Sequence, residues 1–281
     1  MDEQKLGKKV TGCQTMTNST FATQTTEWQM LPAGFSVAEP LYVFTDIHGC
    51  FEAMERLLSK RPKDTRLVFL GDAVDRGPQP MEVLKVLMAD KQNILLRGNH
   101  DAMAWYSQPD VYPTYSWAFQ DWRANGGMIT RDAFRDALKH GAQPGEIAST
   151  VPMIFEDYWH FANNWWRSGN FLFVHAGLPD GKGRKWLGMP PLEAAMHMSS
   201  PYWWRPRDET DLYMEPREVD GENFFVVSGH TPLPEFFALC PYGITLDRSY
   251  RHKMAAEIRP AGNGQPARVR FISTGCNEII M

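Results

Sequence analysis

From Leu41 onward the chain alternates continuous apolar runs with segments whose apolar residues recur at helical spacing. The apolar runs are LYVFTD (41–46), RLVFLGD (66–72) and NILLRGNHD (93–101), and they are separated by FEAMERLLSK (51–60) and PMEVLKVLMAD (80–90). Continuous apolar strands separated by helices of about ten residues are typical of a parallel sheet built from strand–helix–strand units. The pattern therefore predicts the α/β fold class.

Strand-like apolar runs return in the second half of the chain. They are FLFVHAG (171–177) and NFFVVSGHT (223–231), followed by YGITLDRS (242–249) and ARVRFIST (267–274). Because a long segment separates them from the first runs, we expect them to form a second, later sheet.

Two segments lack strand runs. Residues 1–38 are rich in Thr, Gln and Ser with little periodicity, which predicts a flexible N-terminal arm before a domain over 39–281. Residues 102 to about 166 are rich in tryptophan and predict a helical insertion. Its tryptophans either fill the core of the insertion or line a cleft beside a site and stack on a substrate.

The charge and the cysteine content of the chain indicate which partners and which cellular compartment to expect. It carries a formal charge of −4, and its four cysteines, Cys13, Cys50, Cys240 and Cys276, are widely separated. An acidic chain without a basic footprint does not favour binding to nucleic acid or to an anionic membrane. No stretch reaches the roughly 18 to 20 apolar residues of a membrane span. Scattered cysteines suit a reducing compartment, so we expect a soluble cytoplasmic protein.

Polar side chains that can bind a metal ion follow several of the apolar runs. A single aspartate at a strand end is often only a helix cap or a turn residue. In open α/β sheets, however, ligands bind at the carboxyl ends of the strands, so successive polar strand ends predict one shared site. The six candidate ligands are Asp46, His48, Asp72, Asn99, His175 and His230.

The candidate ligands combine oxygen donors with imidazole nitrogens and contain no sulfur. That mixture suits Mn, Fe or Zn better than Ca or Mg. Six protein donors are too many for one catalytic ion with an open position, so they suit two ions bridged by one carboxylate. Two divalent ions and two aspartates leave about two positive charges, which would attract an anionic phosphate. We expect two divalent metal ions, with Mn as the first choice.

Three further residues beside these ligands have predicted catalytic roles. Arg76 in GDAVDRG (71–77) offers a planar fork for phosphate oxygens. His100 in GNHD (98–101) can protonate a leaving alkoxide, while Asp75 holds its other ring nitrogen.

These stretches resemble the signatures of the phosphoprotein phosphatase family of binuclear metallophosphatases, and more closely its bacterial and phage branch. The matching blocks are Asp-x-His-Gly, Gly-Asp-x-x-Asp-Arg-Gly, Gly-Asn-His-Asp, His-Ala-Gly and Gly-His-Thr, in the family's order over residues 46–231. The resemblance implies the calcineurin-like metallophosphoesterase fold, with two mixed β-sheets sandwiched between helices. It also implies one metal held by Asp46, His48 and Asp72, and a second held by Asp72, Asn99, His175 and His230.

The resemblance further implies a second arginine that grips the phosphate. YWWRPR (202–207) resembles the family's Trp-x-Arg element, and we favour Arg205 over Arg207. Arg97 occupies a position typical of the family and is predicted to be a supporting ion-pair residue.

Three stretches stand out beside the family pattern. Thr45 replaces the usual glycine before the first aspartate, which an extended backbone would tolerate, and Asp247-Arg248-Ser249 replaces the usual Asp-Thr-Gly. The second change puts substrate shape in doubt without removing a metal ligand. WRANGGMIT (122–130) resembles a segment of bacterial members, and its Asn125-Gly126-Gly127 predicts a turn.

The function predicted first is hydrolysis of phosphomonoesters, above all phosphoserine or phosphothreonine in proteins, by in-line attack of a metal-bridging hydroxide. An alternative is symmetrical hydrolysis of diadenosine tetraphosphate or a related dinucleoside polyphosphate, which a member of the same family performs with the same metal core. A third hypothesis is a metal-stabilised binding module without turnover. Such a module would be expected to have lost a metal ligand or a member of the His100–Asp75 pair.

Overall fold

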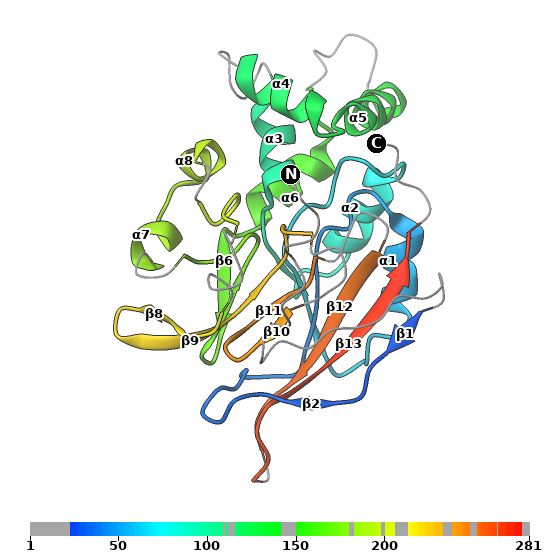
Figure 1. The fold of residues 1–281 in the computed structure, drawn as a ribbon. Coiled ribbons are helices and arrows are strands. Elements are labelled where there is room, and N and C mark those ends of the chain that lie inside the picture. Colours follow the sequence, from blue (N-terminus) through cyan, green and yellow to red (C-terminus); the bar gives the residue numbers. More distant parts are fainter. Residues whose placement is uncertain are drawn as a thin grey trace, which may run out of the picture.

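A computed structural model describes residues 23–108, 111, 116–141, 150–179, 183–197, 200–205, 213–232, 238–247, 252–262 and 264–276. Two β-sheets form its centre (Figure 1). The strands of the first sheet are β1 (Gln24–Thr25), β2 (Gln29–Met30), β3 (Leu41–Phe44), β4 (Arg66–Phe69), β5 (Ile94–Leu95), β12 (His252–Arg259) and β13 (Arg268–Gly275). The strands of the second are β6 (Trp165–Ser168), β7 (Phe171–Val174), β8 (Arg217–Val219), β9 (Glu222–Ser228), β10 (Ala238–Cys240) and β11 (Gly243–Thr245).

Both sheets are mixed. In the first, the order is β1-β13-β12-β3-β4-β5; β3, β4 and β5 are parallel, and β12 runs antiparallel to β3 and to β13. In the second, the order is β10-β11-β9-β7-β6, with β7, β9 and β11 parallel and antiparallel strands at both ends. The prediction of α/β architecture with two mixed sheets is confirmed.

Alternating side chains of β3 explain how the layers pack. Tyr42 and Phe44 join one hydrophobic cluster with residues of α1 and α2, whereas Leu41 and Val43 join another with residues of both sheets. Successive side chains of a strand point to opposite faces, so a strand that is apolar throughout is covered on both faces. The second cluster therefore lies between the two sheets, and the helices cover the outer face.

Eight helices complete the described structure. In Figure 1, α3 to α6 lie together in the upper part of the molecule, above the sheets, and they make up most of the predicted helical insertion. Pro80 starts α2, a position at which its missing N–H is not needed. The helices are α1 (Phe51–Leu58), α2 (Pro80–Met88), α3 (Asn99–Tyr106), α4 (Ser116–Ala124), α5 (Met128–Gly141), α6 (Met153–Phe161), α7 (Gly183–Leu187) and α8 (Pro191–Met196).

The structure differs from the sequence prediction in two strand assignments. The ARVRFIST run forms β13, which pairs with β12 in the first sheet, so its assignment to the second sheet is wrong. Short strands β1 and β2 also pair with β13, so the first sheet begins before residue 39. Only residues 23–38 of the predicted arm are described, and residues 1–22 lie outside the described part of the chain.

Candidate metal centre

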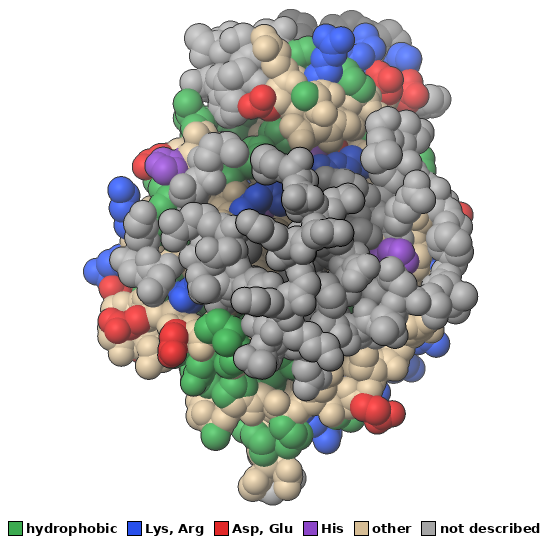
Figure 2. Space-filling view, viewed as in Figure 1, with side chains coloured by type: hydrophobic (Ala, Val, Ile, Leu, Met, Phe, Trp, Pro, Cys, Tyr) green, Lys and Arg blue, Asp and Glu red, His purple; other side chains and the backbone are tan. Residues whose placement is uncertain are grey.

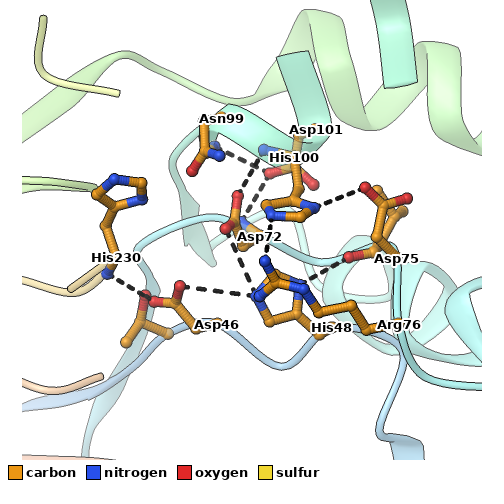
Figure 3. Close-up of polar contacts among 12 residues, drawn as sticks. Asp46, His48, Asp72, Asp75, Arg76, Asn99, His100, Asp101 and His230 are labelled. Atoms are coloured by element: carbon orange, nitrogen blue, oxygen red, sulfur yellow. Dashed lines mark hydrogen bonds and ion pairs between the residues drawn. The ribbon is translucent and has the colours of Figure 1, made fainter. Parts of the chain in front are cut away.

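The strand ends bring the six predicted ligands together at one edge of the sheets, and Figure 3 labels all of them except His175. Asp46 and His48 follow β3, Asp72 follows β4, and Asn99 begins α3 just after β5. His175 and His230 follow the parallel strands β7 and β9 of the second sheet. All six residues are at least 96% buried, with exposed fractions of 0–4%.

The backbone at these strand ends adopts a conformation that L-residues rarely take. Seven non-glycine residues with positive φ occur in the described part of the chain, and all but Asp220 carry candidate site side chains. Such conformations cost about 1–3 kcal/mol each and persist where the surroundings impose them, often at functional sites. The six are Asp46, His48, Asp72, Asp75, Arg76 and His230, with φ between 51° and 73°.

The Asp72 carboxylate lies between two histidines that come from different sheets. Its Oδ2 is 3.6 Å from His48 Nε2, and its Oδ1 is 3.5 Å from His175 Nε2. Two groups of side chains whose ligand atoms lie within 4.8 Å of one another share Asp72, one with His48 and His100 and the other with His175 and His230. One carboxylate thus faces two clusters, the arrangement expected of a bridging ligand.

The ring orientation of two histidines fits the role of a metal ligand. His48 Nδ1 lies 3.0 Å from Val74 O, and His175 Nδ1 lies 2.9 Å from Leu70 O. Because a carbonyl accepts, each Nδ1 carries the proton and each Nε2 presents a lone pair to the centre. A histidine that binds a metal almost always donates its other ring N–H in this way.

Facing acceptor atoms indicate that a cation belongs in the centre. His175 Nε2 lies 2.9 Å from Asn99 Oδ1, although both atoms present lone pairs in the assigned orientation. The Nε2 atom of His230 is buried and has no hydrogen-bond partner. Burial lowers the pKa of His48, His175 and His230, which keeps their rings neutral and able to bind metal. The donor set therefore fits divalent metal ions.

Asp46 is held by neighbours from three segments. Its Oδ2 accepts from the His230 backbone N–H at 3.0 Å and from the Thr45 hydroxyl. Lys253 of β12, which is 2% exposed, donates from Nζ to the Asp46 backbone carbonyl at 2.5 Å. Thr45 has no positive φ, in agreement with the expectation that this position tolerates a side chain, and its hydroxyl contributes a contact that glycine would lack.

His100 differs from the other histidines because a carboxylate holds its Nδ1. Asp75 Oδ2 accepts from His100 Nδ1 at 2.7 Å, and both side chains are buried. Burial raises the pKa of Asp75 to about 7. The Arg76 guanidinium lies across the site, with Nη2 2.9 Å from His100 Nε2 and Nη1 2.8 Å from His48 Nε2.

Two residues of the insertion also contact Asp75 and were not predicted as site residues. The Trp122 indole N–H donates to Asp75 Oδ1 at 2.8 Å, and the Thr130 hydroxyl accepts from the Asp75 backbone N–H at 2.7 Å. Both lie in the WRANGGMIT segment. Its resemblance to a segment of bacterial family members was the available signal, although the segment was interpreted as a turn.

Asp101 is a further residue that the sequence analysis did not single out. Its carboxylate accepts from the backbone N–H groups of Gly98, Asp72 and Ala73 at 2.9–3.0 Å. The Tyr158 hydroxyl of α6 lies 2.9 Å from the same carboxylate. Burial raises the pKa of Asp101 to about 6. Asp101 therefore ties the start of α3 to the loop that carries Asp72.

The arginine predictions have different outcomes. Arg205 is exposed, and its positive charge contributes to the lowered pKa of His100, His175 and His230, although burial is the main cause for all three. Arg207 lies outside the described residues. Among the described residues Arg97 makes no ion pair; it donates to Trp159 O and to Asn164 Oδ1, each at 2.8 Å, and lies over the Trp159 ring.

The segment that departs from the family pattern is described only in part. Arg248 and Ser249 lie outside the described residues, whereas Asp247 is 7% exposed. Burial, and then the charge of Asp46, raise the pKa of Asp247 to about 8, so Asp247 is a further carboxyl group near the centre.

The tryptophans of the insertion are mainly core residues. Trp105 and Trp159 are 9% and 4% exposed and stack on each other with centroids 5.5 Å apart, and Trp122 is 1% exposed. Trp165 and Trp166 are partly buried against the two hydrophobic clusters. The side chain of Trp117 lies outside the described residues. Of the two expectations, core filling holds for the three buried rings.

Sequence comparison assigns this architecture to a known family. The calcineurin-like phosphoesterase family matches residues 39–234, more than half of the chain. The chain belongs to this family. Members of this family use divalent metal ions, which agrees with the clustered aspartates and histidines described above. The two mixed sheets between helices are thus the calcineurin-like fold that the resemblance implied.

Individual relatives cover different shares of this phosphoesterase. The serine/threonine-protein phosphatase 1 of Salmonella typhimurium is 37% identical over 208 residues, which are 69% of this chain and 79% of that protein. A candidate serine/threonine-protein phosphatase of Caenorhabditis elegans is 40% identical over 79 residues, and the match spans only 17% of its length. A symmetrical bis(5'-nucleosyl)-tetraphosphatase of Coxiella burnetii is 38% identical over 63 residues, or 21% of this chain and 22% of that protein. These names confirm the predicted resemblance to phosphoprotein phosphatases.

On the face of the molecule in Figure 2, acidic and basic side chains are interspersed around the margin. None of the helices in the described ranges is both long and apolar enough to cross a membrane.

Proposed function

We propose that this protein is a binuclear metal-dependent phosphatase that hydrolyses phosphomonoesters. The observation that carries the proposal is the position of Asp72, whose two oxygens face His48 and His175 at 3.6 and 3.5 Å. Asp46, His48 and Asp72 would hold one ion, and a second would be held by Asp72, Asn99, His175 and His230. When bound, two divalent ions supply an activated water nucleophile and stabilise charge on the phosphoryl group. Manganese suits the mixed oxygen and nitrogen donors best.

The side chains around the centre have complementary tasks in this proposal. Arg76 binds phosphate oxygens through its planar fork and Arg205 provides a second positive charge at the exposed side. His100 Nε2 delivers the proton that the leaving oxygen needs, while Asp75 accepts a hydrogen bond from His100 Nδ1 and sets the ring orientation.

The proposed substrate class is phosphoserine or phosphothreonine in proteins. The relative that matches the largest share of this chain among those described above, the Salmonella phosphatase, carries that name and supports the choice. A cytoplasmic location stays a prediction, which rests on the wide separation of the four cysteines along the chain.

A second candidate substrate is a dinucleoside polyphosphate. The observation that favours it is the partly buried Trp203, whose ring centroid is 6.1 Å from that of His230, because an aromatic ring beside a phosphate site can stack on a base. The Coxiella relative bears the corresponding name over a short match. The binding-module hypothesis has less support, since all six candidate ligands and the His100–Asp75 pair are present.

Turnover of three substrates by one preparation tests these proposals. Metal-free protein is reconstituted with Mn²⁺ and assayed on p-nitrophenyl phosphate, a phosphothreonine peptide and diadenosine tetraphosphate. Preference for the peptide supports the protein phosphatase, and preference for the dinucleotide supports the second candidate. Inactivity towards all three with two Mn²⁺ bound per chain would overturn the proposed activity and favour a binding module. Asp72→Asn serves as the control for contaminating phosphatases, because it removes the shared carboxylate.

A further inference from the structure

We propose that Trp122 is a positioning residue, whose indole N–H orients the Asp75 carboxylate and thereby aims the His100 imidazole at the leaving oxygen. The inference deepens the proposed phosphatase function and rests on it. Trp122 belongs to the helical insertion, so the insertion would be part of the catalytic apparatus and not only a covering layer.

The two oxygens of Asp75 have separate partners. Oδ2 accepts from His100 Nδ1 at 2.7 Å, and Oδ1 accepts from Trp122 Nε1 at 2.8 Å. All three residues are at least 98% buried, so water does not compete for these oxygens. A carboxylate with a single partner can rotate and carry the imidazole with it, whereas two partners on different oxygens hold its plane.

The segment that carries Trp122 also holds the backbone of the two neighbouring catalytic candidates. The Thr130 hydroxyl accepts from Asp75 N–H at 2.7 Å, and Gly126 O accepts from Arg76 N–H at 3.2 Å. Asp75 and Arg76 have φ values of 73° and 66°, a conformation that needs external support. The segment 122–130 therefore contacts both the backbone N–H and the carboxylate of Asp75.

Gly127 fixes the plane of the indole. A Cβ at this position would lie 2.3 Å from both Cδ1 and Nε1 of Trp122, so the ring lies directly against the glycine backbone. Only a residue without a side chain permits this approach. The glycine that resembled a simple turn residue is required for the ring to reach Asp75.

The partner of the indole distinguishes Trp122 from an ordinary core tryptophan. Trp165 and Trp203 donate from Nε1 to the backbone carbonyls of Leu187 and Ala195, as a buried indole usually does to satisfy its N–H. Trp122 donates instead to a carboxylate that contacts a catalytic candidate. A backbone carbonyl would be enough to satisfy the hydrogen bond of the indole N–H, so that need alone does not explain a carboxylate partner.

The decisive comparison uses substrates that differ in their need for a proton. The leaving group of a phosphoserine peptide is the basic serine alkoxide, which depends on a proton from the acid, whereas the leaving group of p-nitrophenyl phosphate is the weakly basic p-nitrophenolate. For Trp122→Phe we expect kcat on the peptide to fall about 10- to 100-fold, the usual effect of losing a contact that orients a functional histidine. We expect KM and the p-nitrophenyl phosphate rate to stay within about threefold. Trp165→Phe, which removes an indole N–H on edge strand β6, is the matched control and should match the wild type on both substrates.

A double-mutant cycle separates positioning from a general loss of packing. His100→Asn alone should lower the peptide rate by about 100- to 10,000-fold. If Trp122 acts through His100, adding Trp122→Phe to that variant changes the rate little further. Thr130→Val, which removes the hydroxyl that accepts from Asp75 N–H, should give the same substrate signature if Trp122→Phe does not fold. Thermal unfolding and Mn²⁺ content are measured for every variant.

The outcomes separate this inference from the function on which it rests. Equal losses of Trp122→Phe on both substrates, or a full additional loss in the His100→Asn background, would overturn the role of Trp122 while leaving an active phosphatase. A wild-type protein that binds Mn²⁺ and hydrolyses neither substrate overturns the proposed function, and the inference with it.

Discussion

Replacing Gly98 by alanine should displace Asp72, although the φ and ψ angles of residue 98 suit alanine. Gly98 has φ −103° and ψ 176°, which alanine adopts without strain. An added Cβ, however, would lie 2.0 Å from Asp72 Oδ1 and 2.5 Å from Asp72 N. Cβ atoms essentially never come closer than 3.0 Å to such neighbours, so the Asp72 oxygen has to move by at least about 1 Å.

That displacement sets the size of the expected effect. A misplacement of about 1 Å in a catalytic site can cost about 100-fold in rate. Overpacking of a tight interior typically costs about 1–3 kcal/mol, or about 2–12 °C in Tm for a chain of this size. We therefore expect Gly98→Ala to lose most of its activity and part of its Mn²⁺ while the metal-free protein still folds.

Three measurements on one preparation test this expectation: Mn²⁺ per chain by mass spectrometry, kcat on p-nitrophenyl phosphate, and Tm in EDTA. The control is Gly262→Ala, because a Cβ at Gly262 meets nothing within 4 Å. It should match the wild type in all three. The reasoning would be refuted by a Gly98→Ala protein that retains two Mn²⁺ and a kcat within about twofold of wild type.

Three further predictions follow from the centre and the core. Mn²⁺ at about 100 times its dissociation constant should stabilise the protein by about 2.7 kcal/mol and raise Tm by about 5–11 °C relative to EDTA; an equal rise in His230→Ala would exclude this histidine as a ligand. Lys253→Met removes the ammonium group that contacts Asp46 O and should weaken Mn²⁺ binding by about 10- to 100-fold, measured by calorimetry; an unchanged affinity would contradict its role. Burial raises the pKa of Tyr42, Tyr106, Tyr158, Tyr202 and Tyr213 above 10. The stability that these neutral hydroxyls contribute below about pH 10 is therefore lost as the pH rises, because the unfolded chain ionises first; tyrosinate absorbance equivalent to all nine tyrosines of the chain while circular dichroism stays native would contradict this.

The local motifs were sufficient to predict which side chains gather at the strand ends. Asp46 and His48 are two residues apart at one strand end, so their proximity depends only on the local backbone. Asp72 and Asn99 follow neighbouring strands that are parallel, and parallel strands bring their carboxyl ends to the same edge. For this reason the apolar pattern and the polar strand ends were enough to name all six residues that now lie together.

Sheet membership was harder to infer from order along the chain. The apolar run of β13 follows the strands of the second sheet in sequence, yet β13 pairs with β12 beside β3. An apolar run predicts a strand, but it does not state which partner supplies the hydrogen bonds. That choice depends on the packing of both sheets, and it was the point at which the sequence prediction failed.

The sequence by itself determined the α/β class, the polar strand ends and the family resemblance, because each depends on residues that are close in sequence or on a regular period. The tertiary structure alone decided what supports the centre. Trp122 reaches Asp75 across 47 positions, and Lys253 reaches Asp46 across 207. Contacts over such separations have no period and no local motif, since they exist only when the whole chain brings the insertion and β12 to the strand ends.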